Sequence, residues 1–151
     1  IAAYFDDHTL SCGLTYCGHP LACAAGVACV NYYKEANILE NVNAVGKVLG
    51  EKLEEMKNKH ACIGDVRYIG LFSCVELVYD KETKKPLVEY GKDPEGKMGK
   101  IIGKLKEKGF MTYSHENMVF ICPPLIITQE QLLEELEKFD KVMGFVDKEL
   151  I

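Results

Sequence analysis

The chain has 151 residues, 48% of them hydrophobic and 27% charged, a mixture typical of a globular protein with one domain or at most two. Its formal net charge is -5, and no run of lysine and arginine is long enough to follow a phosphate backbone, which argues against a nucleic-acid partner. The longest weakly polar run, Pro20 to Tyr33, is too short and too rich in alanine and glycine to cross a bilayer, so we expect no membrane segment.

The first long predicted element is a helix from about Pro20 to Glu35. Its apolar residues recur with helical spacing, and proline suits a first helical turn, where its missing N–H costs nothing. The chain before it begins with IAAYFDD and without Met, so we expect a fragment of a larger protein. A second, amphipathic helix follows, with Asn37 as its cap, Glu40 as the reciprocal partner, and Lys59 and His60 as favourable cations near its end.

A strand is predicted next, at residues 66–78. It is rich in β-branched and aromatic residues and apolar on both alternating sets, as a strand covered on both faces would be. Arg67 and Glu76 could form an ion pair in this region, with a structural role. The polar stretch 79–96, with its glycines and prolines, predicts an excursion with little regular structure.

The last part of the sequence predicts two helices separated by two short strands. The first helix starts at Asp93–Pro94 and ends at Gly109. The strands cover 110–114 and 118–122, and Thr128 with Gln131 caps the final helix. This order of elements, with short connections, predicts an α+β fold in which a small antiparallel or mixed sheet is backed by helices.

The cysteines are seven in number and lie among apolar neighbours, which favours a reducing compartment, the cytoplasm, over a disulfide framework. Four residues that could bind zinc lie close together in the sequence: Cys12, Cys17, His19 and Cys23. Their spacing is not the paired C-x-x-C type of zinc sites, and the last of them falls inside a predicted helix. We therefore expect no metal site and interpret these cysteines as small hydrophobic residues.

Gly13 and Gly18 flank a turn that places Thr15 just ahead of the predicted helix. A hydroxyl, free backbone N–H groups and the positive end of a helix together suit a phosphate oxygen. The Gly-Lys-Ser/Thr ending of a P-loop is absent. Because a threonine in a tight turn commonly bonds its own backbone, the residues alone leave both interpretations open.

Three segments, in this order, resemble the class III (ornithine/4-aminobutyrate-type) pyridoxal-phosphate aminotransferases. GLTYCGHPLACAAGVACV at 13–30 resembles that family's TYSGHPLACAAALA signature. VRYIGLFSCVELV at 66–78 resembles its VRGxGLMxGxEL strand, and FICPPLIITQEQLLEELEKFDKVM at 120–143 resembles its APPLxITxEEL segment and final helix. YFDDHTLSCGLTYCGHP at 4–20 is most similar to the taurine/ω-amino acid:pyruvate branch.

The resemblance implies the C-terminal portion of a fold-type I enzyme. Residues 1–19 would be the end of the large cofactor-binding domain and its phosphate turn, and residues 20–151 a helix plus the small C-terminal α+β domain. The family's cofactor-binding lysine lies upstream of the matched segment, and no lysine here occupies a matching position. The resemblance therefore implies no catalytic residue in this chain, no activity of the chain alone, and cofactor binding only in the intact enzyme.

The resemblance also implies site residues. Thr15 would give its hydroxyl, and the turn near Leu14 a backbone N–H, to the phosphate of pyridoxal 5'-phosphate held by the other subunit of a homodimer. Tyr16 and His115 would lie at the substrate cleft. His115 and Glu116 stand where related sequences often read RW, so an arginine clamp for a substrate carboxylate or sulfonate is not expected from that hairpin.

The function implied is transfer of an amino group from an amine or ω-amino acid to a keto acid such as pyruvate, with the amino donor and the keto acid as the small-molecule partners. Two alternatives stay open. The chain could be a folded binding or scaffold module without catalysis, or a zinc or thiol-redox protein that carries stoichiometric metal.

Overall fold

The computed structural model describes residues 1–13 and 15–151 and divides them into two compact units, Ile1–Ala36 and Asn37–Ile151. The division follows the first long helix, whereas the sequence analysis placed a boundary after residue 19. The assignment of residues 1–19 to the end of a large cofactor domain stays a prediction. Within the described residues, no helix is both long and apolar enough to cross a membrane.

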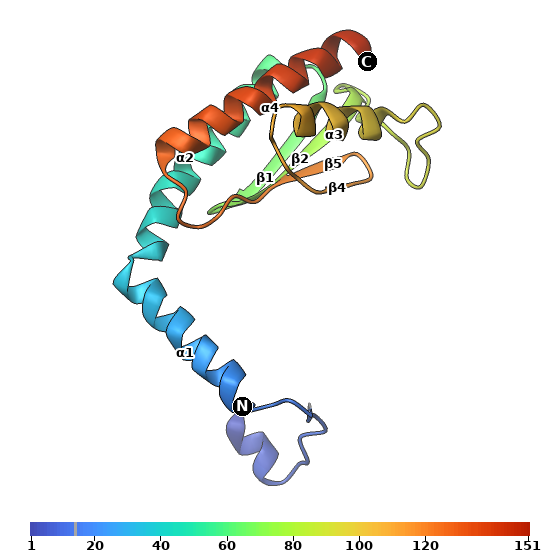
Figure 1. The fold of residues 1–151 in the computed structure, drawn as a ribbon. Coiled ribbons are helices and arrows are strands. Elements are labelled where there is room, and N and C mark those ends of the chain that lie inside the picture. Colours follow the sequence, from blue (N-terminus) through green and yellow to red (C-terminus); the bar gives the residue numbers. More distant parts are fainter. Residues whose placement is uncertain (14) are drawn as a thin grey trace. The chain divides into compact units, whose positions relative to one another are not determined.

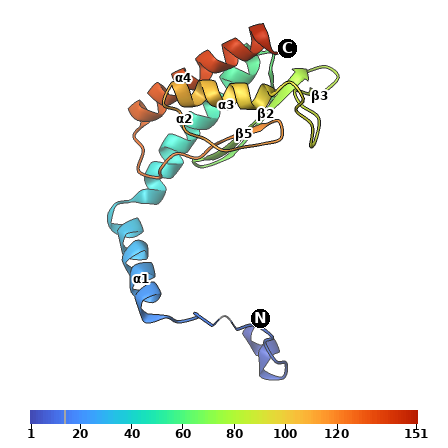
Figure 2. The same cartoon turned by 45° about the vertical axis from the view of Figure 1, so that its right-hand side comes forward.

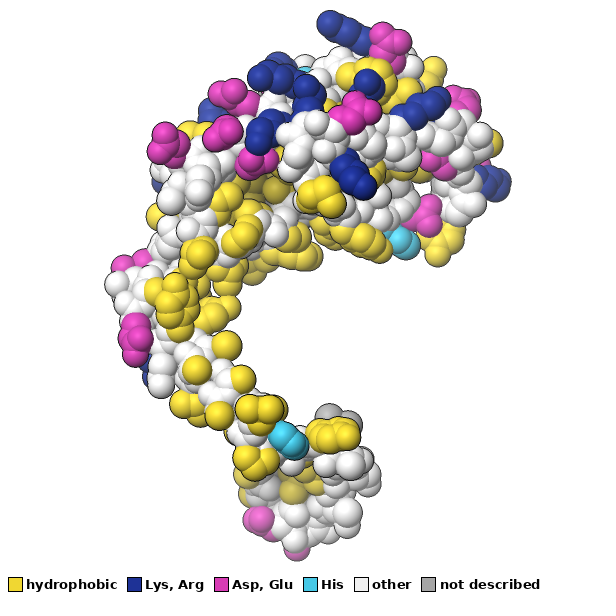
Figure 3. Space-filling model, viewed as in Figure 1, with side chains coloured by type: hydrophobic (Ala, Val, Ile, Leu, Met, Phe, Trp, Pro, Cys, Tyr) yellow, Lys and Arg dark blue, Asp and Glu magenta, His cyan; other side chains and the backbone are white. Residues whose placement is uncertain are grey.

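The N-terminal unit contains a short 3-10 helix, η1 (Ala2–Asp6), and the helix α1 (Pro20–Glu35). The predicted bounds of α1 are confirmed, with proline at its first position. Its apolar side chains are exposed within the unit, and Figure 3 shows them along its length. A helix that is apolar on all sides is normally buried against other protein, so α1 requires a covering surface.

The C-terminal unit is an antiparallel sheet covered by helices. It contains α2 (Ile38–Lys59), β1 (Ile63–Ile69), β2 (Phe72–Asp80), β3 (Lys85–Pro86), α3 (Lys97–Glu107), β4 (Ser114–His115), β5 (Met118–Ile121) and α4 (Gln129–Glu149). The strand order is β1-β2-β5-β4, with β3 also paired to β2. The three helices lie on the same face of the sheet (Figures 1 and 2). The predicted α+β class is confirmed, and of the two sheet types left open the antiparallel one is present.

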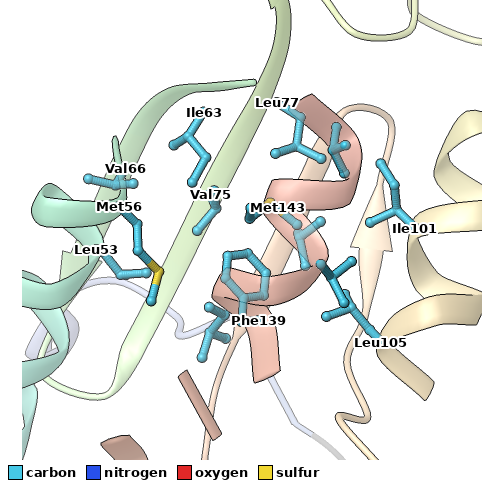
Figure 4. Close-up of a cluster of buried hydrophobic side chains, with 14 of the residues drawn as sticks. Leu53, Met56, Ile63, Val66, Val75, Leu77, Ile101, Leu105, Phe139 and Met143 are labelled. Atoms are coloured by element: carbon cyan, nitrogen blue, oxygen red, sulfur yellow. The ribbon is translucent and has the colours of Figure 1, made fainter. Parts of the chain in front are cut away.

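The hydrophobic core lies between the sheet and the three helices, as Figure 4 shows. The sheet and each of the three helices contribute to the core. The largest fully buried side chains are those of Leu49, Leu53, Ile63, Val75, Leu77, Ile101, Leu105, Val119, Leu132, Leu136, Phe139 and Met143. Because this core is complete within residues 37–151, the C-terminal unit has its own source of hydrophobic stabilisation.

The single strand predicted at 66–78 is wrong: the segment is a hairpin of β1 and β2. Ile69 pairs with Phe72, which leaves Gly70 and Leu71 as a two-residue loop. Gly70 has φ 55°, and a glycine at the first loop position is typical of tight hairpin turns. Alternate residues therefore face the helices or the opposite side of the sheet, rather than one strand being covered on both faces.

The face of the sheet opposite the helices carries an ion pair beside aromatic side chains. Arg67 Nη2 donates to Glu76 Oε2 at 2.9 Å, which confirms the predicted pair. The ring centroid of Phe120 lies 6.3 Å from that of Phe72 and 5.5 Å from that of Tyr113. The hairpin thus separates a dry face, buried by the helices, from a mixed polar and aromatic face.

Two glycines of α2 allow the hairpin to approach the helix closely. A Cβ on Gly46 would lie 2.6 Å from the carbonyl carbon and oxygen of Gly70. A Cβ on Gly50 would overlap the ring of Tyr68. Tyr68 stands where the resembled family usually has glycine, and Gly50 provides the space that its ring occupies.

The start of α2 differs from its prediction. Asn37 precedes the helix as expected, but it has left-handed φ and ψ of 49° and 41°, and its side chain makes no cap. An N-cap side chain reaches the helix from an extended backbone, so the predicted capping box with Glu40 does not form. The backbone oxygen of Asn37 instead accepts from Glu40 N.

The start of α3 and the strand before β5 also differ from their predictions. α3 begins at Lys97, and the carboxylate of Asp93 accepts its backbone N–H at 2.8 Å from four residues away. Gly109 lies just beyond the helix with φ 79°, as predicted. The expected strand 110–114 is reduced to β4, because residues before it reach β5 through isolated bonds, such as Phe120 N–H to the oxygen of Tyr113.

The predicted capping box of α4 is confirmed. Gln131 N–H donates to Thr128 Oγ1 at 3.2 Å, and Thr128 N–H donates to Gln131 Oε1 at 3.1 Å. We expect Thr128→Ala to lower the free energy of unfolding of the chain by about 1 kcal/mol, because the backbone N–H of Gln131 loses its acceptor. Urea denaturation followed by circular dichroism measures the change. Thr128→Ser keeps the hydroxyl and should match the wild type, and equal loss in both variants would contradict the role of the cap.

Candidate functional site

The segment around Thr15 forms a tight turn directly before α1. The side chain of Thr15 is exposed, and Thr15 begins a turn that runs to Gly18. His19 N–H donates to the backbone oxygen of Tyr16 at 3.2 Å, which closes the turn. Gly18, the third residue of the Tyr16–His19 turn, has φ 72°, a value that favours glycine. The local sequence therefore fixes a turn that presents the Thr15 hydroxyl at the surface of its unit.

The first turn of α1 follows at once and has no side-chain cap. His19 precedes the helix without a capping hydrogen bond from its side chain, and its backbone oxygen accepts the N–H of Cys23 at 2.9 Å. Pro20 has no N–H, so Leu21 and Ala22 supply the first backbone donors, which lie too early in the helix to have partners within it. These donors and the helix dipole create a positive potential there.

The charges of this segment also suit an anion. Residues 9–33 contain no Asp, Glu, Lys or Arg. No carboxylate of this stretch would repel a phosphate, and no ammonium group of it would hold one. The attraction available from these residues is therefore a hydroxyl hydrogen bond and backbone dipoles.

The other predicted site residues have different surroundings. Tyr16 follows Thr15 in the turn and is 79% exposed, with its ring centroid 6.2 Å from that of His19. His115 is exposed at the end of β4 in the C-terminal unit, where it pairs with Met118. The structure thus brings Thr15 and Tyr16 together in one unit and places His115 in the other, and Leu14 lies outside the described residues.

The hairpin that carries His115 is held by its neighbours. The carboxylate of Glu116 accepts Gly91 N–H at 2.9 Å, and Glu116 itself has φ 51°. Asn117 is buried, and its side-chain amide donates to the backbone oxygen of Leu77 at 2.9 Å. His115 therefore projects from a fixed hairpin rather than from a free loop.

The four zinc candidates do not come together. Cys12, Cys17 and Cys23 are exposed free cysteines. In the part of the chain that the structure describes, no three His, Cys, Asp or Glu side chains are arranged to hold a metal ion. The zinc hypothesis therefore has no geometric support among these residues.

A family model described as aminotransferase class-III matches residues 4–143. The chain belongs to the class-III aminotransferase family. The match includes all three segments on which the resemblance was based, and it includes the turn at Thr15, α1, the sheet and most of α4.

Solved structures and curated members of the class-III aminotransferase family align with nearly the whole chain. A structure of taurine:2-oxoglutarate aminotransferase from Bifidobacterium kashiwanohense, in complex with PLP and glutamate, is 49% identical with a TM-score of 0.90, over 99% of this chain and 33% of that one. Taurine–pyruvate aminotransferase from Bilophila wadsworthia is 33% identical over 97% of this chain and 31% of its own. The Caenorhabditis elegans ethanolamine-phosphate phospho-lyase homolog 1 is 32% identical over 89% of this chain and 28% of its own.

The chain thus spans about three tenths of the length of the curated class-III relatives that it matches. Those relatives include a protein named as a phospho-lyase homolog beside one named as an aminotransferase. Membership of the family alone therefore does not select the reaction or the substrate.

Sequence reasoning missed a polar cluster around a buried histidine, His60, in the class-III chain. His60 lies between the carboxylates of Asp140 and Asp147, which come from α4. The sequence places His60 80 and 87 residues from these partners, so local patterns gave no signal except the seven-residue spacing of the two aspartates on one helix.

Proposed function

We propose that these residues are the C-terminal part of a pyridoxal-phosphate-dependent aminotransferase that takes the amino group of an ω-amino donor and passes it to a keto acid. The observation that carries the proposal is the alignment of 99% of the chain, at 49% identity, with a taurine aminotransferase. The donor class proposed is an ω-amino acid or aminosulfonate such as taurine, and the acceptor is a keto acid such as pyruvate.

The proposed role of the Thr15 turn is to hold the phosphate of the cofactor. Pyridoxal phosphate supplies, when bound, the electron sink that amino-group transfer requires. The turn fits that phosphate because it offers an exposed hydroxyl beside an uncapped helix N-terminus, in a stretch without carboxylates. Thr15 would donate a hydrogen bond to a phosphate oxygen and so fix the cofactor's position without taking part in proton transfer.

The proposed function is tested with the complete enzyme that contains these residues. The protein is reconstituted with pyridoxal phosphate, and taurine or another ω-amino acid is supplied with pyruvate or with 2-oxoglutarate. We expect formation of alanine or glutamate, measured by chromatography. Release of inorganic phosphate from ethanolamine phosphate without amino-acid product would replace the aminotransferase proposal with a lyase.

We further propose that Thr15 serves the cofactor of the partner subunit in a homodimer. The apolar side chains of α1 support this, because Leu21, Val27 and Val30 are 75%, 61% and 56% exposed and need a protein surface to cover them. Thr15 lies shortly before such a helix, so it would lie near the same covering surface.

A mixing experiment tests the donation between subunits. One variant of the complete enzyme carries Thr15→Val, and the other lacks the cofactor-binding lysine that the family has upstream. In a heterodimer of the two, donation across the interface restores one complete site, whereas donation within a subunit restores none. Recovery of activity on mixing supports the proposal, and no recovery from a heterodimer verified by mass spectrometry contradicts it.

The alternative of a non-catalytic scaffold is examined with the same complete protein. A scaffold predicts no amino transfer with any donor and no dependence of folding on pyridoxal phosphate. Under the aminotransferase proposal, added cofactor stabilises the protein in thermal unfolding because it binds only the folded state.

A further inference from the structure

Four lysines on α3 and at its C-terminal end have no carboxylate partner among residues 1–13 and 15–151. They are Lys100, Lys104, Lys106 and Lys108. Every lysine of α2, by contrast, forms an ion pair. In a chain whose net charge is -5, α3 is therefore a local concentration of unpaired positive charge.

Three of these lysines lie along one side of α3, because Lys100, Lys104 and Lys108 recur at every fourth position. Like charges four residues apart destabilise a helix. The helix dipole favours cations in the last turn, which includes Lys104 and Lys106 but not Lys100. The stability of α3 alone therefore does not explain this stripe.

The stripe borders an open groove between α3 and α4, two helices that pack against each other (Figure 1). This α3–α4 groove is lined by Lys104, Glu107, Lys108, Lys141, Val142 and Phe145. Its volume is about 310 Å³. Sites for small molecules have volumes of roughly 300–1,000 Å³, so the groove suits a small ligand.

Positive charge exceeds negative charge in the α3–α4 groove, because three lysines line it with one glutamate. Lys141 lies 4.0 Å from Glu137, but these side chains are 65% and 74% exposed, so the pair is weak. Lys104 Nζ lies 4.4 Å from the ring centroid of Phe145, a cation–π contact that holds this ammonium group at the groove. The groove therefore attracts an anion and has one of its cations already in place.

The ammonium groups of the groove suit phosphate oxygens. Each is a compact point charge with three donors, and lysine is a common phosphate ligand in proteins. Because the three lysines come from two helices, an anion with charge at several successive positions can contact all of them at once. Val142 and Phe145 add apolar surface that a part of the ligand without charge can cover.

The surface of α4 outside the groove favours a short anion over a long one. Four glutamates precede Lys141 on this helix: Glu130, Glu134, Glu135 and Glu137. A polyanion that continued along α4 would meet their carboxylates. The charge pattern therefore restricts the ligand to one that ends within the groove.

We propose that the α3–α4 groove binds a small polyphosphate, either free or as the tail of a nucleotide. Lys104, Lys108 and Lys141 donate hydrogen bonds to its phosphate oxygens. The groove lies within the C-terminal unit and includes neither Thr15 nor His115, so this proposal does not depend on the proposed function. A complete enzyme without aminotransferase activity would leave it intact.

The first test is an NMR titration of the ¹⁵N-labelled 151-residue chain with tripolyphosphate. The salt concentration is held at about 0.15 M, where charges more than about 8 Å apart are largely screened. We expect saturable shifts at residues 104–108 and 141–145, while sulfate at equal ionic strength produces none that saturate. Absent shifts, or shifts spread equally over the lysines of α2, would overturn the proposal, and this result needs no variant that folds.

The second test removes two lysines of the groove. Isothermal titration calorimetry with tripolyphosphate is measured for the double variant Lys104→Gln with Lys108→Gln. Because exposed charge contacts are individually weak, we expect the dissociation constant to rise about tenfold for the pair. Lys47→Gln with Lys52→Gln removes the same charge from α2 and should leave the dissociation constant unchanged. Equal weakening in both double variants would mean attraction by net charge, and it would contradict a site in the groove.

A third test compares ligands to identify the source of the polyphosphate. AMP carries one phosphate and should bind at least about tenfold more weakly than tripolyphosphate, because it cannot contact all three lysines. Tighter binding of ATP than of tripolyphosphate indicates a nucleotide tail, and equal binding indicates free polyphosphate. AMP that bound as tightly as tripolyphosphate, or a single-stranded oligonucleotide that bound more tightly than both ATP and tripolyphosphate, would overturn the proposal of a small polyphosphate.

Discussion

Replacing Gly46 by alanine is expected to lower the free energy of unfolding of the 151-residue chain by about 2 kcal/mol. The added Cβ would lie 2.6 Å from the carbonyl carbon and oxygen of Gly70 and 2.7 Å from its Cα. Both partners are backbone, so no rotation of a side chain relieves the overlap, and α2 must move away from the β1–β2 hairpin. Urea denaturation followed by far-ultraviolet circular dichroism measures the loss.

Gly103→Ala in α3 is the matched control. It is the same chemical change in a helix of the same unit, but nothing lies within 4 Å of the added Cβ. Because alanine is the better helix former, this variant should gain roughly 0.5–1 kcal/mol. A lower free energy of unfolding for Gly46→Ala together with a higher one for Gly103→Ala would establish close contact between α2 and the hairpin at Gly46. Equal gains would mean that α2 does not lie against Gly70 as described.

The bounds of α1 and the capping of α4 were predictable because their signals are local. Pro20 fixes the first turn of α1 through its own backbone angle, and Thr128 with Gln131 caps α4 within three residues. The start of α2 was mispredicted although Asn37 was correctly placed, because a residue letter does not reveal a left-handed backbone. Asp93 likewise caps α3 from four residues before its first residue, Lys97, a sequence separation that the usual capping pattern does not include.

The hairpin of β1 and β2 was hidden by its apolar loop. Leu71 lies in the turn yet is 3% exposed, so hydrophobicity continues through a position where loops are normally polar. Only Gly70 marks the reversal, and a single glycine also occurs within strands. The sheet type, left open between antiparallel and mixed, depended on this reversal.

In the candidate site, too, the features set by neighbouring residues were predictable, and those set by tertiary packing were not. The Thr15 turn was predictable because Gly13, Gly18 and Pro20 lie within a few residues of it. His60 was interpreted as a helix-end cation, which its position after α2 supports, but its partners come from a helix that begins 69 residues later. Pairing over such a separation is decided by how α4 packs on α2, and periodicity in one helix does not specify that.

Removing the hydroxyl of Thr15 is expected to weaken pyridoxal-phosphate binding by the complete enzyme roughly tenfold to hundredfold. A hydrogen bond to a charged group contributes about 1.5–3 kcal/mol, and 1.4 kcal/mol corresponds to about a tenfold change in affinity. Thr15→Val keeps the shape of the side chain and removes only its donor. Titration of the cofactor-free protein with pyridoxal phosphate, followed by fluorescence, measures the dissociation constant.

Two companion variants separate a phosphate ligand from a structural threonine. Thr15→Ser restores the hydroxyl and should recover most of the affinity, whereas Thr9→Val makes the same change on an exposed residue of the same unit and should leave it unchanged. If the Thr15 hydroxyl bonded only its own turn, Thr15→Val would alter thermal stability without cofactor and leave the dissociation constant as it was. A wild-type dissociation constant in Thr15→Val would therefore remove Thr15 from the cofactor site, while the family membership of the chain would stand on the match over residues 4–143.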